Sequence, residues 1–436
     1  EAGKGSSHPN YMLDMNGTLL FTPTESQYGD ELWKTDGTAN GTTLVKDIFQ
    51  GTEDADIAQP VNAGGTLYFI ADNGINGAEL WKSDGTDTGS SMVKDINPGS
   101  GDAQIDFLTA SGNKVYFIAD DGSGLELWVS DGSDSETKMV LDINPGPGSA
   151  DVQYLTDVGG TPFFSADNGS NGAELWKTDG TPGNTAMIEI NAFGGSNPRD
   201  LINVGGILFF QANDGTNGAE LWAYQGGSAS IVKNINPGNS NSYPRNFADI
   251  NGVLFFFANN GVDGYELWKS AGMENTTALV KDINPSGSSG VDKITNVNGK
   301  AYFIANDGDN GKELWISDGT EAGTKMIKDI RSGSYGSSPE LLTNVDGVLY
   351  FRAYDGTNGS ELWKSDGTES GTKIVKDIWP GSDDYGDGNN GYPQELFAAD
   401  GALYFNARDG IHGEELWRSD GTIAGTKMLK DLYPGW

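Results

Sequence analysis

Short apolar runs separated by glycine-rich polar turns repeat along the whole chain. Residues 291–330 show one unit, in which the runs KITNV, AYFIA, ELWIS and KMIKDI are separated by NG, NDGDNGK and DGTEAGT. Each run has the length of a strand and is too short for a helix, and each turn carries a glycine that adopts positive φ at low cost. The unit is therefore predicted to be a four-stranded antiparallel meander.

The tripeptide ELW marks this unit nine times, at 31–33, 79–81, 126–128, 174–176, 220–222, 266–268, 313–315, 361–363 and 415–417. The second run of a unit is apolar at consecutive positions, as in LYFIA at 67–71, which predicts a strand packed between two layers. The repeated Trp predicts an indole that fills the space between adjacent sheets. Four-stranded sheets repeated in series are typical of a β-propeller.

The predicted fold class is all-β, with one β-propeller of four-stranded antiparallel blades over residues 1–436. Nine complete units predict nine blades, and eight blades are the alternative. The predicted repeats are approximately 9–50, 51–98, 99–146, 147–193, 194–238, 239–286, 287–332, 333–381 and 382–436.

The charge and composition exclude several classes of function. The formal net charge is −35, which repels nucleic acid and anionic lipid. The chain has no Cys and only two His, His8 and His412, so thiolate metal sites and repeated histidine-based centres are excluded. No apolar run is long enough for a membrane span. Neither a nucleic-acid partner nor a membrane span is expected.

The turn between the second and third runs follows the pattern [Asp/Asn]-Gly-x-[Asn/Asp]-Gly-x-Glu. In one interpretation it is a long hairpin whose Asn and Asp bond their own backbone, and whose loop donates hydrogen bonds to the Glu of ELW. In the other, its clustered oxygen atoms bind Ca²⁺. The candidate calcium ligands are Asn73, Asn76, Glu79, Asp121, Glu126, Asn168, Asn171, Glu174, Asp214, Asn217, Glu220, Asp307, Asn310, Glu313, Asp355, Asn358, Glu361, Asp409 and Glu415.

An insertion at 382–392, SDDYGDGNNGY, is the one place where a unique site is expected, because its length exceeds what the repeat needs. Trp379, Tyr385 and Tyr392 are the candidate ligand-binding residues there. Aromatic faces beside Asn, Asp and Ser suit a sugar-binding surface. The alternative is that these aromatic rings only pack the linker onto the blade.

The run ELWKSDGTESGTKIVKDI at 361–378 resembles the ELWxxDGT-repeat family of bacterial secreted proteins. The resemblance covers essentially the whole chain and implies a secreted, extracellular protein at the bacterial cell surface, with a propeller-like array and no known reaction. The fifth and sixth units depart from it, reading ELWAYQGGSAS and ELWKSAGMENT. Because these units lose the DGT aspartate, the DGT turn is expected to be structural.

Repetition, acidity and the lack of a single catalytic constellation predict a protein that is not an enzyme. We expect a non-catalytic extracellular binding or structural module of the adhesion type, stabilised by calcium, with an extracellular glycan or protein partner. One alternative is self-assembly, as a subunit of an extracellular filament or surface assembly. The other is a glycan-active enzyme, which needs a pair of carboxylates about 5–9.5 Å apart.

Overall fold

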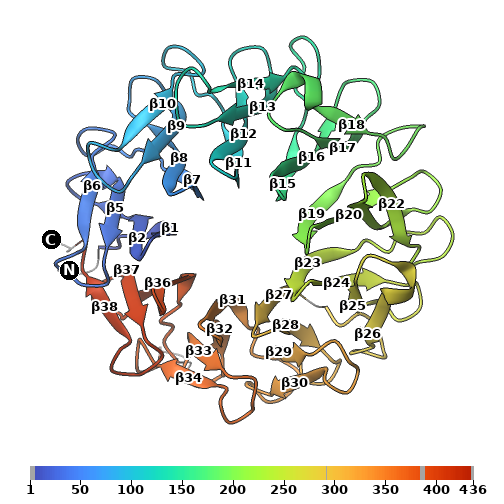
Figure 1. Cartoon of the computed structure of the whole chain (residues 1–436). Helices are drawn as coiled ribbons and strands as arrows, with labels where there is room; N and C mark the ends of the chain where they lie inside the picture. The colour runs from blue at the N-terminus through green and yellow to red at the C-terminus, as the bar shows by residue number, and fades with distance from the viewer. Residues whose placement is uncertain (1–4, 291, 383–387, 434–436) are drawn as a thin grey trace. The chain divides into compact units, whose positions relative to one another are not determined.

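The computed structural model describes residues 5–290, 292–382 and 388–433. Within these ranges the chain forms nine four-stranded antiparallel sheets, in each of which the strands pair in chain order (Figure 1). The prediction of an all-β protein with nine four-stranded antiparallel blades is confirmed, and the fold class is a β-propeller. The single-domain prediction and the repeat boundaries remain predictions.

Nearly all of the regular structure is strand. The first three sheets contain β1 (Asn10–Met15), β2 (Thr18–Thr22), β5 (Leu32–Thr35) and β6 (Thr43–Lys46); β7 (Ala58–Ala63), β8 (Thr66–Asp72), β9 (Ala78–Ser83) and β10 (Ser91–Lys94); and β11 (Asp106–Ser111), β12 (Lys114–Asp120), β13 (Leu125–Ser130) and β14 (Lys138–Leu141). The next three contain β15 (Gln153–Val158), β16 (Thr161–Asp167), β17 (Ala173–Lys177) and β18 (Ala186–Ile188); β19 (Arg199–Val204), β20 (Ile207–Asn213), β21 (Ala219–Gln225) and β22 (Ser228–Lys233); and β23 (Arg245–Ile250), β24 (Val253–Asn259), β25 (Tyr265–Ser270) and β26 (Ala278–Lys281). The last three contain β27 (Asp292–Val297), β28 (Lys300–Asn306), β29 (Lys312–Ser317) and β30 (Lys325–Lys328); β31 (Glu340–Val345), β32 (Val348–Tyr354), β33 (Ser360–Ser365) and β34 (Lys373–Lys376); and β35 (Gln394–Ala399), β36 (Ala402–Arg408), β37 (Glu414–Ser419) and β38 (Lys427–Lys430). A small hairpin of β3 (Thr24–Glu25) and β4 (Gly29–Asp30) and two 3₁₀ turns, Pro182–Asn184 and Glu274–Thr276, complete the described elements.

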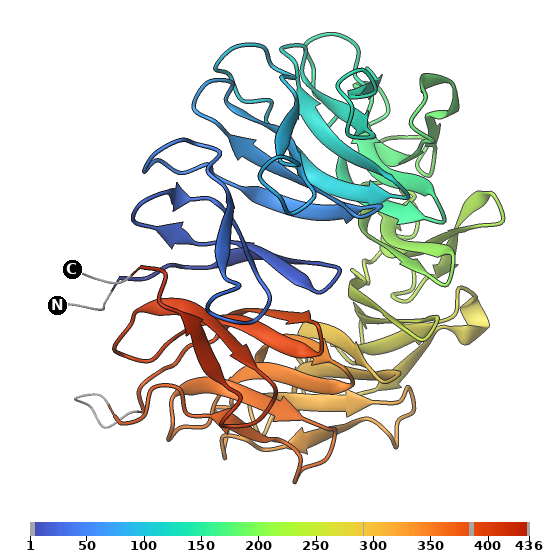
Figure 2. The ribbon, with the colours of Figure 1, turned by 60° about the vertical axis from the view of Figure 1, so that its left-hand side comes forward.

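By its internal contacts the chain divides into two compact units. One consists of Val45–Val262 and Ser270–Ala278, and in it the first strands β7, β11, β15, β19 and β23 lie side by side in this order. The other consists of Glu1–Leu44, Asp263–Lys269 and Leu279–Trp436, and in it β27, β31, β35 and β1 lie side by side. The last sheet of the chain is therefore a neighbour of the first sheet (Figure 2).

The ELW tryptophans are all buried, and the two described below lie between neighbouring sheets, as the sequence predicts. All nine indoles are at most 7% exposed. Trp128 packs with Tyr68 and Leu80 of the preceding sheet, and Trp363 packs with Leu314 and Ile316 of the preceding sheet. An indole at such a contact removes a large apolar area from water, so Trp128 and Trp363 each join two successive blades.

Lysines strengthen the same contacts between blades. The lysine that ends a fourth strand reaches the turn between the third and fourth strands of the next sheet. Lys281 Nζ donates to Thr324 O at 3.0 Å, and Lys376 Nζ donates to Thr426 O at 2.8 Å. The Lys376 ammonium group also lies 5.4 Å from the ring centroid of Trp417, a cation–π distance. The repeated KDI sequence thus contributes to cohesion between sheets.

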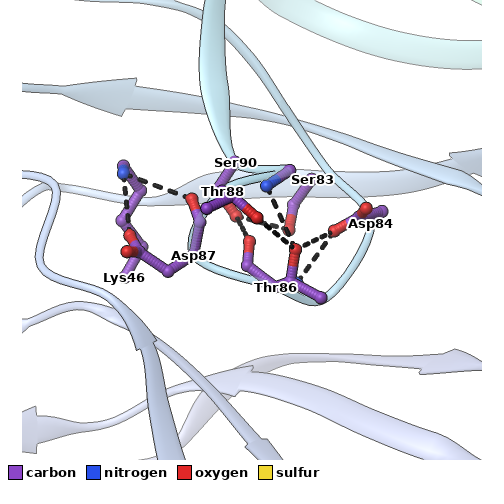
Figure 3. Close-up of polar contacts among 8 residues, drawn as sticks. Lys46, Ser83, Asp84, Thr86, Asp87, Thr88 and Ser90 are labelled. Atoms are coloured by element: carbon purple, nitrogen blue, oxygen red, sulfur yellow. Dashed lines mark hydrogen bonds and ion pairs between the residues drawn. The ribbon is translucent and has the colours of Figure 1, made fainter.

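The DGT turn forms a local hydrogen-bond network, shown for the second sheet in Figure 3. Asp84 Oδ1 accepts hydrogen bonds from Thr86 N at 2.9 Å and Thr86 Oγ1 at 2.7 Å. Behind the turn, the buried hydroxyls of Ser83 and Ser90 bond to each other at 2.7 Å. Such Asp-centred contacts hold a tight turn without any ligand, because the side chain replaces a backbone acceptor.

Candidate binding surface

The candidate calcium ligands of the loops between second and third strands form Asx turns. In the seventh sheet, Asp307 Oδ1 accepts from Asp309 N at 3.0 Å and from Asn310 N at 2.9 Å, and Asp307 Oδ2 accepts from Asn310 Nδ2 at 2.8 Å. The same arrangement joins Asp214 to Asn217 and Asp355 to Asn358. Related contacts join Asn73 to Asn76, Asn168 to Asn171 and Asp409 to His412. Asp121 accepts from Ser123.

The glutamates of ELW lie apart from these turns. Each of the following glutamates is at most 1% exposed and accepts hydrogen bonds from the linker that follows its own sheet: Glu79, Glu126, Glu174, Glu220, Glu266, Glu313, Glu361 and Glu415. The expected partner was the loop between the second and third strands. The structure corrects this expectation, because the linker amides that donate lie 15–30 residues further along the chain.

Glu313 shows the complete form of this contact, which we call the glutamate clamp. Its Oε1 accepts from Arg331 N at 3.2 Å and Ser337 N at 2.7 Å, and its Oε2 accepts from Ile330 N at 3.3 Å and Ser337 Oγ at 2.6 Å. The linker between two sheets is thus fixed at both of its ends by one carboxyl group.

Burial perturbs these carboxyl groups strongly. It raises the pKa of Glu79, Glu126, Glu220, Glu266 and Glu415 to about 7, and that of Glu361 to about 8. Hydrogen bonds from the linker oppose the increase in part, because they favour the ionised form. In an isolated site such values suggest acid–base chemistry, but here they recur in successive blades with the same structural partners.

A set of aspartates that the sequence analysis did not select lies next to the loops. In the second sheet, Asn76 Nδ2 donates to Asp95 Oδ2 at 2.8 Å. In Asp95 and in the equivalent aspartates of five other sheets, the carboxylate oxygen Oδ1 is buried and has no hydrogen-bond partner among the described residues. These aspartates are Asp47, Asp95, Asp282, Asp329, Asp377 and Asp431. The repeated KDI sequence was the signal that could have identified them. In the described ranges, however, no group of three or more His, Cys, Asp or Glu side chains is arranged to hold a metal ion.

Aromatic rings of the eighth linker, which joins β34 to β35, lie next to guanidinium groups of β32 and β36. Arg408 Cζ lies 5.6 Å from the ring centroid of Trp379 and 5.8 Å from that of Tyr392. Arg352 Cζ lies 4.1 Å from the centroid of Tyr392 and pairs with Glu340. We call these four residues, Trp379, Tyr392, Arg352 and Arg408, the Trp379 cluster. The third candidate, Tyr385, lies outside the described residues.

A cavity of about 270 Å³ adjoins the Trp379 cluster. Ser6, Trp379, Arg408, Gly410, Gly413 and Glu414 line it. Glu414 Oε2 lies 2.9 Å from His8 Nδ1 at its rim. The cavity therefore offers a flat aromatic surface with a cationic donor and a carboxylate acceptor close by.

Part of the Trp379 side chain serves the fold. Its ring fills the space that a side chain on Gly410 would need, and Phe49 covers Gly74 of the second sheet in the same way. Asn144 and Asn236 occupy the equivalent space at Gly169 and Gly261. Linker packing thus explains a side chain at this position, but not the choice of Trp or the neighbouring arginines.

No protein-family model and no curated protein matches the chain. Among solved structures, one from a structural and mechanistic study of two prolyl endopeptidases aligns with a TM-score of 0.45 at 11% identity, over 81% of this chain and 54% of that chain. A puromycin hydrolase variant complexed with PGG gives 0.39 at 12%, over 81% and 58%. The β-propeller domain of the Trilobed protease from Pyrococcus furiosus gives 0.40 at 11%, over 73% and 95%. The chain thus spans little more than half of the first two proteins.

The described part of the chain has no helix that is long and apolar enough to cross a membrane.

Proposed function

We propose that the protein is a non-catalytic extracellular binding module whose ligand-binding site is the Trp379 cluster with its adjoining cavity. The observation that carries this proposal is that two aromatic rings of one linker lie against two guanidinium groups, which come from β32 and β36. Its extracellular placement is supported by the resemblance of the ELW units to secreted bacterial repeats. The ligand class that fits best is a glycan, because a sugar ring can lie against Trp379 while its hydroxyls bond to Arg408 and Glu414.

The glutamate clamps argue against the glycan-active enzyme. A glycosidase needs two carboxyl groups that reach the scissile bond. The clamp glutamates have shifted pKa values, but they are buried and directed at linker amides. Acid–base chemistry on a sugar would require these linkers to move away, so we assign the glutamates a structural role.

A glycan array tests the proposal with purified full-length protein. Wild type should bind a subset of printed glycans, and Trp379→Ala should reduce this signal by at least about tenfold. Phe49→Ala is the matched control, because Phe49 makes the equivalent contact with a loop glycine in the second sheet. This control should retain binding while undergoing a comparable loss of linker packing.

Two results would contradict the proposal. Wild type that binds no glycan, or Trp379→Ala protein that binds as wild type does, would remove the Trp379 cluster as a glycan site. Release of shortened glycans during incubation would show that the module is catalytic.

A further inference from the structure

A second pocket, of about 490 Å³, lies between the fourth and fifth sheets, inside the unit that contains both. Asp151, Gln153 and Tyr154 contribute from β15 and the segment before it, and Ser165 and Asp167 from β16. The following linker closes it with Asn197 and Pro198, and Arg199 at the start of β19 completes it. Its volume lies within the range of known small-molecule sites, about 300–1,000 Å³.

Ser165 makes room for this pocket. It is 5% exposed, pairs with Gln153 across the sheet, and occupies a position that carries larger side chains in several other sheets. The equivalent residues are Thr22, Ile70, Ile118, Gln211, Phe257, Ile304, Arg352 and Asn406. Where Ile304 occupies the position, the corresponding pocket between the seventh and eighth sheets measures about 310 Å³. A short side chain at position 165 therefore accompanies the larger space.

The polar groups around the pocket are available to a ligand. Within the described part of the chain, the side chains of Asp151, Gln153 and Arg199 make no hydrogen bond. Asp167 uses Oδ1 for Gly169 N at 2.8 Å, which leaves Oδ2 as an acceptor. Asn197 uses Nδ2 for Gly195 O at 3.0 Å, which leaves Oδ1. The pocket thus offers donors and acceptors together with the ring of Tyr154.

The backbone supports a preformed pocket. Tyr154 and Asn197 both have positive φ, at 56° and 48°, and the equivalent residues Gln59 and Tyr243 do as well, so the repeat itself sets the backbone at these positions. The bulge at Gln153–Thr156 produces this conformation at Tyr154. Side chains held in this way need little reordering when a ligand binds.

We propose that this pocket binds a neutral saccharide of one or two rings. The carboxylates of Asp151 and Asp167 would repel an anionic ligand, and the guanidinium group of Arg199 would repel a compact cation. A sugar uses both kinds of group, because vicinal hydroxyls donate to carboxylates and accept from Arg and Gln, while its apolar face can lie on Tyr154. We call this site the Ser165 pocket.

Saturation-transfer NMR and titration calorimetry test the proposal with full-length protein and the probes glucose, galactose, N-acetylglucosamine, lactose and cellobiose, with glucuronate as the anionic probe. Wild type should bind at least one neutral sugar in preference to glucuronate. Ser165→Ile, which introduces the residue of three other sheets at this position, should weaken that affinity by at least about tenfold. Asn406→Ile is the matched control, because it places the same residue at the equivalent buried position of the ninth sheet, opposite Gln394, which does not line the pocket, and it should bind as wild type does.

Arg199→Ala provides a second variant if Ser165→Ile does not fold, since Arg199 is an exposed side chain with no hydrogen bond to a described residue. It should weaken sugar binding as well. The proposal is overturned if no neutral sugar binds wild type, if glucuronate binds best, or if both variants bind as wild type does. Trp379→Ala should leave this affinity unchanged, so failure of the Ser165 pocket and failure of the Trp379 cluster give different results.

Discussion

Replacement of Glu361 by Gln should reverse its effect on stability between about pH 5 and about pH 8. Glu361 is fully buried, and its two oxygens accept hydrogen bonds from Ile378 N at 2.9 Å and Gly391 N at 2.6 Å. Burial, with the nearby charges of Asp377 and Asp355, raises the pKa of this carboxyl group from 4.5 to about 8. Folded protein therefore keeps the proton over a pH range in which unfolded protein has already lost it.

The sign and size of the effect follow from this difference. Because the pKa is raised in the folded state, the stabilising contribution is complete below the unfolded pKa and is lost as the pH rises through the folded pKa. Each unit of pKa shift corresponds to about 1.4 kcal/mol, so the free energy of unfolding should fall by about 4 kcal/mol between about pH 5 and about pH 8 on account of this group. Gln resembles the protonated carboxyl in shape and does not ionise, but its NH₂ group cannot accept a hydrogen bond, so one of the two linker amides loses its acceptor at every pH.

Urea denaturation of wild type and Glu361→Gln at both pH values is the assay. The variant should be the less stable protein by about 1–3 kcal/mol at about pH 5, because one linker amide has lost its acceptor, and the more stable by about 1–3 kcal/mol at about pH 8, where wild type has lost about 4 kcal/mol. Asp366→Asn is the control. Hydrogen bonds from Thr368 lower the pKa of Asp366, so its contribution is lost only as the pH falls through more acidic values and should not change over this range. An equal deficit for Glu361→Gln at both pH values would show that the folded carboxyl is ionised throughout, and the reasoning from burial would be wrong.

Three further predictions concern the blades. Trp315→Ala should lower the free energy of unfolding by about 3–5 kcal/mol in urea denaturation, because the indole is 6% exposed and stacks on Phe303 at 6.4 Å; a loss below about 1 kcal/mol would contradict its role between sheets. Ser365→Ala should cost about 1–3 kcal/mol, because it removes the partner of the buried Thr372 hydroxyl at 2.7 Å and of Gly367 N at 3.1 Å, whereas the exposed turn aspartate replaced in Asp366→Asn should cost less; the reverse order would contradict this ranking. Calcium binding by the Asx-turn loops remains a prediction of the sequence: the melting temperature should be higher in calcium than in a chelator, and equal values would contradict it.

The sheets and their packing could be predicted from the sequence because nine units repeat the same pattern of short apolar runs and glycine-containing turns. Turns after short runs determine the meander, and the buried position of Trp315 follows from its place in an apolar strand. The partners of Glu313 and Lys376 were harder to predict. Glu313 bonds to a linker up to 24 residues later, and Lys376 to a turn 50 residues later, so both contacts depend on how sheets and linkers pack in space. For the lysines, KDI and DGT recur at nearly the same spacing, and this could have indicated that each KDI lysine contacts the DGT turn of the next unit.

A repeat protein also permits a comparison that an ordinary chain does not, because its own units show which positions the fold leaves free. In the second strand, the residues before and after the variable position are nearly constant, as in LYFIA, PFFSA and LYFRA, while the position itself carries Ile, Ser, Gln, Phe, Arg or other residues. The fold therefore accepts side chains that range from Ser to Phe and Arg there. Both proposed sites depend on this position: Ser165 accompanies the pocket between the fourth and fifth sheets, and Arg352, its equivalent in the eighth sheet, lies against Tyr392 in the Trp379 cluster. Variation at one structural position thus gives individual blades different surface chemistry while the Trp and Glu of ELW keep every blade in place.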